Sequence, residues 1–219
     1  MIKADEIIKS KRKTLTVSLD RDGRVIVRAP KYYSDKQINA ALADSENWIR
    51  KQLAKYEKNK QILNSYRIAD GGKMLLLGED FEIRFADIES ETVEGRTITL
   101  PESDPEKYLK ALYRRIAKNY FTERTNRFAA VTGLTPSSVR VTGAKTRWGS
   151  CSAKKSINFS LNLVMCPPEV IDYVIVHELC HIKYMDHSKL FWNEVEKHIP
   201  DYKQRRKWLK DNRFIMDLI

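Results

Sequence analysis

The chain has 219 residues, of which 42% are hydrophobic and 32% are charged, and its formal net charge at pH 7 is +11. This composition is that of a folded protein and excludes an intrinsically disordered chain. No run of about eighteen apolar residues occurs and the first residues include acidic side chains, so we expect no membrane span, no signal peptide and a cytoplasmic location. The three cysteines form no CxxC pair, which argues against a disulfide framework or a cysteine-based zinc site.

The first hundred residues predict a β-rich region that contains one helix. Residues 12–28 alternate between apolar and polar side chains around an Asp-Gly pair, as is typical of a β-hairpin. A helix is expected to begin at Ser34, because Gln37 stands three residues later in the capping-box position. A second β-rich stretch follows between residues 73 and 100. We therefore expect an N-terminal region over residues 1–102.

The second half of the chain predicts longer helices and a pair of strands. A Ser-Asp-Pro-Glu sequence is a strong start for a helix over residues 103–131, which a glycine then ends. Strands are expected at residues 139–142 and 157–163. The helix predicted at 168–184 is apolar nearly all round, which indicates a buried position. These elements define a second expected domain, residues 103–219.

An HExxH motif lies on this buried helix. His177 and His181 are four residues apart, so both imidazoles can reach one ion from the same helix face. Glu178 follows the first histidine and can take a proton from water beside a metal without becoming a ligand. Burying these three side chains would be costly unless they share a partner. The motif therefore predicts a catalytic zinc site with Glu178 as the general base.

More than one residue could be the third metal ligand. His187 comes six residues after His181, just past the predicted helix end, and would complete a three-histidine zinc set. Glu194 and Glu196 on the next predicted helix could instead supply a carboxylate. We favour His187. Imidazole ligands also suit manganese, iron, cobalt and nickel, so the sequence does not fix the metal.

The longer pattern around this motif resembles a known family. The runs that carry the resemblance are Arg147-Trp148-Gly149-Ser150-Cys151, Ile157-Asn158-Phe159, His177-Glu178-Leu179-Cys180-His181, His187-Ser188 and Phe191-Trp192. Together they are similar to the YgjP-like (DUF45) metallopeptidase family, which is grouped with the M48-type and SprT-like zincins. The resemblance implies an α+β, zincin-like catalytic domain, in which a small sheet packs on the HExxH helix. It also implies His177, His181 and His187 as zinc ligands and Glu178 as the catalytic base.

Arg147 is a second candidate catalytic residue. It stands before a Gly-Ser turn between two predicted strands, where its guanidinium could stabilise an oxyanion or bind a phosphate. A salt bridge within a loop would explain it equally well on spacing alone. The resemblance favours the catalytic interpretation.

Several functions are compatible with these features. A zinc metallopeptidase acting on a polypeptide is favoured. A nucleoside triphosphate (UTP) pyrophosphatase is the first alternative, because residues 104–160 are strongly basic and one branch of the family carries that name, although no GxxxxGK[ST] loop is present. A DNA-associated, SprT-like protease would use the basic surface to bind nucleic acid, but no recognition motif supports it. A purely structural zinc site would not need Glu178. The sequence does not predict the oligomeric state.

Overall fold

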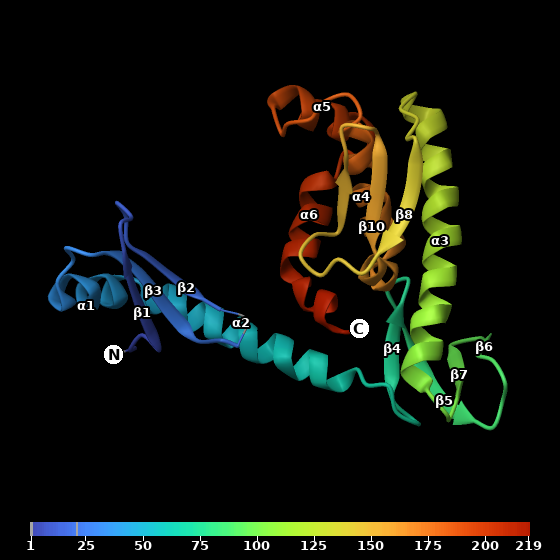
Figure 1. Cartoon of the computed structure of the whole chain (residues 1–219), viewed down its shortest axis with the longest axis horizontal. Coiled ribbons are helices and arrows are strands. Elements are labelled where there is room, and N and C mark those ends of the chain that lie inside the picture. Colours follow the sequence, from blue (N-terminus) through green and yellow to red (C-terminus); the bar gives the residue numbers. More distant parts are fainter. Residues whose placement is uncertain (1, 21) are drawn as a thin grey trace. The chain divides into compact units, whose positions relative to one another are not determined.

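The described part of the chain combines helices with three small sheets, which confirms the predicted α+β class (Figure 1). The structure is a computed structural model and describes residues 2–20 and 22–219. Contacts within the chain divide it into two units, Met1–Ile62 and Leu63–Ile219. Among the described residues, no helix combines the length and the apolar character needed to cross a bilayer.

The first unit is a three-stranded sheet with helical cover. Its elements are β1 (Glu6–Ser10), β2 (Thr16–Leu19), β3 (Val25–Pro30), α1 (Asp35–Asp44) and most of α2 (Glu46–Ser65). The predicted hairpin is the antiparallel pair β2–β3, and β1 adds to β3 in parallel on the other side. The Ser34–Gln37 capping box forms as predicted, but the one helix expected here is wrong, because the chain forms two helices that are separated at Ser45. Alternate β3 side chains pack against Ile38, Leu42 and Ile49 from the helices to form the core.

The second unit begins with a four-stranded sheet in the order β4-β5-β7-β6. Its strands are β4 (Lys73–Leu76), β5 (Glu79–Ala86), β6 (Thr92–Glu94) and β7 (Thr97–Pro101). Backbone and side-chain hydrogen bonds tie this sheet to later segments. The Tyr113 hydroxyl donates to the Leu75 carbonyl at 2.6 Å, and the Leu77 amide donates to the Val164 carbonyl at 2.8 Å. The unit boundary therefore falls forty residues earlier than the predicted division at 102/103. Where the catalytic domain itself begins stays a prediction.

A long helix and a second sheet follow. They are α3 (Pro105–Thr132), β8 (Ser138–Thr142), β9 (Gly149–Cys151), β10 (Ser156–Ser160) and the 3-10 helix η1 (Leu161–Met165). The sheet has the order β8-β10-β9, and β9 is its antiparallel edge strand. Helix α3 runs alongside β8 (Figure 1) and ends at Gly133, whose φ of 71° is the left-handed conformation of a helix C-cap. The strand predicted to reach residue 163 stops at Ser160, because the chain turns there into η1.

The C-terminal part supplies the remaining helices, α4 (Pro168–Cys180), α5 (Lys189–His198), α6 (Tyr202–Asp211) and the 3-10 helix η2 (Arg213–Asp217). Helix α4 is buried on nearly all sides, as predicted, and packs on α3, α6 and β9. Arg124 on α3 makes two hydrogen bonds, at 2.8 and 2.5 Å, to the Asp172 carboxylate on α4. The predicted end of this helix at Tyr184 is wrong. It ends at Cys180, with His181 as its C-cap.

Candidate metal centre

Helix α4 carries two of the three histidines. The turn that follows the last residue of this helix orients the second one, His181. The His177 ring lies over the last turn of the helix, and His181 is the capping residue. After His181 the chain turns, so that the Tyr184 carbonyl lies 2.9 Å from His181 Nδ1. A carbonyl oxygen can only accept, so Nδ1 carries the hydrogen and donates it. The lone pair of His181 is therefore on Nε2, the atom that would bind a metal.

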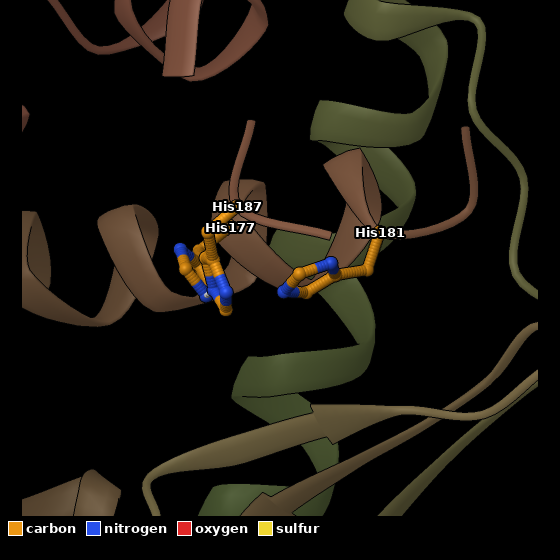
Figure 2. Close-up of side chains that lie close together, drawn as sticks. All are labelled: His177, His181 and His187. Carbon is orange, nitrogen blue, oxygen red and sulfur yellow. Dashed lines mark hydrogen bonds between the residues drawn. The ribbon is translucent and has the colours of Figure 1, made fainter. Parts of the chain in front are cut away.

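His187 completes the cluster from the connection between α4 and α5. Its Nε2 lies 3.2 Å from His177 Nε2, and one ring nitrogen from each of the three histidines lies within 4.8 Å of the others. Figure 2 shows the His177 and His187 rings beside each other and the His181 ring pointing toward them. The buried Phe191 ring packs against all three imidazoles, with centroids 4.4 to 4.9 Å away. Packing of the first turn of α5 thus holds the connection that carries His187 in place.

The alternative carboxylate ligands lie elsewhere. Glu194 pairs with Lys183 at 3.0 Å and contacts His198 at 3.4 Å. Glu196 pairs with Lys203. Within residues 2–20 and 22–219, the three histidines are the group of potential ligands close enough to share one ion. The structure therefore brings His187 to the other two histidines and leaves both glutamates outside.

The chemistry of this donor set fits a metal such as zinc. Zinc–nitrogen bonds of about 2.0–2.1 Å in a tetrahedron would separate two ligand nitrogens by about 3.4 Å, close to the observed 3.2 Å. Burial and the neighbouring His181 and His187 lower the pKa of His177 to about 3, and burial lowers the pKa of His181. These two rings are therefore neutral at pH 7, the form that binds metals. His177 Nδ1 is also buried without a hydrogen-bond partner among the described residues.

Glu178 is buried beside this cluster, with 5% of its surface exposed. Burial raises the pKa of Glu178 to about 8, and the nearby positive charge of Arg147 opposes that rise. Gly149 on β9 lies directly against the side chain. A Cβ atom on Gly149 would stand 2.7 Å from Glu178 Oε1 and 2.8 Å from its Cγ. The edge strand can thus approach the helix this closely only because residue 149 has no side chain.

We expect Gly149→Ala to lower kcat by about a hundredfold, because a misplacement of about 1 Å at a reacting group can have that effect. The group that must move is the end of the Glu178 side chain, so the fold and the metal content should persist. Kinetics with a peptide substrate, thermal unfolding and elemental analysis check this. Gly143→Ala is the matched control, since a Cβ there meets no atom within 4 Å. Equal kcat values in both variants would contradict the expected role of the glycine.

A pocket of about 460 Å³ opens beside the cluster. Its lining includes His177, Glu178 and the predicted candidate Arg147. Helix α6 and η2 contribute three further cations, Arg206, Lys210 and Arg213. From the sequence, the basic segment 203–207 indicates only an exposed helix face. The spacing of the three cations, four and then three residues, would have placed them on one helical face. Only the tertiary structure shows that these cations line the same pocket as His177.

Comparisons with known proteins give one family match and one similar solved structure. The family model described as YgjP-like, metallopeptidase domain matches residues 13–212 of the chain. A solved structure, the crystal structure of the metallopeptidase zymogen of Pyrococcus abyssi abylysin, is 25% identical to the chain with a TM-score of 0.38. That match covers 41% of this chain and 92% of the other. No curated protein matches the chain.

Proposed function

Because the chain belongs to the YgjP-like metallopeptidase family and is therefore a metal-dependent hydrolase, we propose that it is a zinc-dependent peptidase. His177, His181 and His187 would hold the ion, and Glu178 would act as the general base. The observation that carries this proposal is the convergence of three imidazoles beside a buried carboxylate. A set of three protein ligands leaves one position open, as in catalytic rather than structural zinc sites.

In this mechanism the chain's own residues position the reactants and move one proton. When bound, zinc supplies Lewis acidity, which polarises the substrate carbonyl and makes water a nucleophile near neutral pH. Glu178 accepts the proton of the attacking water and passes it to the leaving amine. Gly149 and the walls of α4 and β9 hold the Glu178 carboxylate in place. The positive charge of Arg147 opposes the rise in the pKa of Glu178 that burial causes, and a bound metal cation would lower this pKa further and so favour the carboxylate form.

Arg147 has a supporting part in the proposal. It lines the same pocket as His177 and Glu178, and its charge acts on Glu178. A guanidinium in this position can donate hydrogen bonds to the oxygen that becomes negative when water attacks a carbonyl. Its side chain is exposed on the pocket wall. We therefore assign Arg147 to oxyanion stabilisation.

Hydrolysis of a nucleoside triphosphate is the second candidate. The observation that favours it is the set of four cations in the pocket lining, which could bind phosphates. Nothing among the described residues singles out DNA binding, and the SprT-like alternative stays a prediction from net charge.

Removal and return of the metal test the proposed function. We expect the purified protein to cleave an unfolded protein substrate, to lose this activity on treatment with a chelator, and to regain it with one equivalent of zinc. Mass spectrometry of the products identifies the cleaved bonds, and UTP incubated in parallel tests the second candidate. A zinc-loaded protein that cleaves no polypeptide would contradict the proposal.

A further inference from the structure

Three cations from the C-terminal helices line the same pocket as His177 and Glu178. Arg206 and Lys210 come from α6 and Arg213 from η2, and all three side chains are exposed at the pocket lining. Among the described residues, Glu178 is the one acidic side chain that lines the same pocket, and it is buried. The open side of the pocket is therefore strongly positive.

The basic residues on the rest of α6 are neutralised. Lys203, Arg205 and Lys207 each form an ion pair with a carboxylate, at 3.5, 2.9 and 2.9 Å. In the part of the chain that the structure describes, Arg206, Lys210 and Arg213 form no such pair. Positive charges without counter-charges at a pocket mouth raise the local concentration of anionic ligands. The difference between the two sides of α6 points to a ligand with negative charge on the pocket side.

Two of the three cations are held in place by contacts. The Arg206 guanidinium lies 4.9 Å from the centre of the Trp192 ring, which stacks in turn on the His187 ring at 5.6 Å. Arg213 donates to the Thr146 carbonyl from two guanidinium nitrogens, at 3.4 Å each. Stacking and hydrogen bonds reduce the freedom that an arginine loses when it binds a carboxylate. These cations are therefore arranged before substrate arrives.

From this arrangement we infer that the enzyme prefers peptides that carry an aspartate or glutamate beside the bond to be cleaved, with that carboxylate bound by Arg206, Lys210 and Arg213. This inference rests on the proposed function. An acidic side chain suits the pocket better than a triphosphate. The pocket lining also contains the largely apolar side chains of Trp148, Tyr173 and Leu209, and the sequence has no glycine-rich phosphate loop.

A pair of peptides tests this inference on the full, zinc-loaded chain. Both peptides have the sequence that surrounds a bond which the enzyme cleaves in a protein substrate. One carries glutamate next to that bond, and the other carries glutamine at the same position. We expect kcat/KM to be about tenfold higher for the glutamate peptide, as two or three exposed ion pairs would give. The preference should shrink as salt concentration rises, because salt screens exposed charges. Fluorescence anisotropy with Glu178→Gln should show the same preference in binding.

Two double variants of α6 test whether the preference for the glutamate peptide depends on the cations that line the pocket. In Arg206→Gln/Lys210→Gln the ratio of the two kcat/KM values should fall toward one. The control Lys203→Gln/Lys207→Gln removes the same charge from the same helix outside the pocket and should keep the ratio. Zinc content is measured in both, so that loss of metal is not mistaken for loss of specificity.

The outcomes separate the two proposals. Cleavage of both peptides at equal rates, or an unchanged ratio in Arg206→Gln/Lys210→Gln, would overturn the inference and leave the peptidase intact. Hydrolysis of UTP without cleavage of any peptide would overturn both, and would assign these cations to phosphate groups. A preference for the glutamate peptide that disappears only in the pocket-side variant supports the inference.

Discussion

Replacement of Glu178 by glutamine is expected to lower kcat for peptide hydrolysis by about a thousandfold, while the protein keeps its zinc. The amide has nearly the same size and can fill the same buried space beside Gly149. It cannot accept a proton at neutral pH, however, and general-base catalysis typically contributes about 10²- to 10⁴-fold. Steady-state kinetics with elemental analysis of the same samples measure both quantities.

The result depends on the variant remaining folded. Burial raises the pKa of Glu178, so the free protein without metal already disfavours the charged form. A neutral amide at this position should therefore be tolerated or slightly stabilising in the metal-free protein, and thermal unfolding with and without zinc would show this. If Glu178→Gln kept full activity, another group would have to be the base, and the proposed mechanism would be wrong.

Replacement of His187 by alanine should remove the metal. The two histidines of α4 would remain, but a site with three protein ligands would lose one of them. Even changes in groups that only support metal ligands weaken metal binding about 10- to 100-fold, so we expect affinity to fall by more than about a hundredfold. Peptide hydrolysis should drop below detection at stoichiometric zinc. Competition with a coloured zinc chelator measures the affinity directly.

The fourth histidine provides the control for this experiment. His198 lies at the end of α5, with its Nε2 3.4 Å from Glu194, and takes no part in the cluster. His198→Ala should therefore retain zinc. Undiminished zinc in His187→Ala would instead indicate that a carboxylate is the third ligand. Combining His187→Ala with Glu194→Gln or with Glu196→Gln would then identify that carboxylate.

The local parts of the fold could be read from the sequence because their signals are local. The hairpin β2–β3, the capping box at Ser34 and the left-handed end of α3 at Gly133 depend on residues within a few positions of each other. The predicted end of the HExxH helix was wrong, since apolar residues continue past Cys180. The helix ends there because the backbone amides of residues 182–184 donate hydrogen bonds to the last carbonyls of the helix in a tight turn. Periodicity does not detect such a turn.

The spacing of the HExxH motif is enough to predict metal-dependent hydrolysis. Residues four apart on a helix share a face, so the helical backbone alone places His177 and His181 together, with Glu178 on the adjoining side. The tertiary structure decided everything that depends on distant segments meeting. It brought His187 rather than Glu194 to the other histidines, set Gly149 of a three-residue strand against Glu178, and turned the cations of α6 toward the pocket. The physical reason is that such contacts are fixed by the packing of whole elements on one core, which local spacing does not encode.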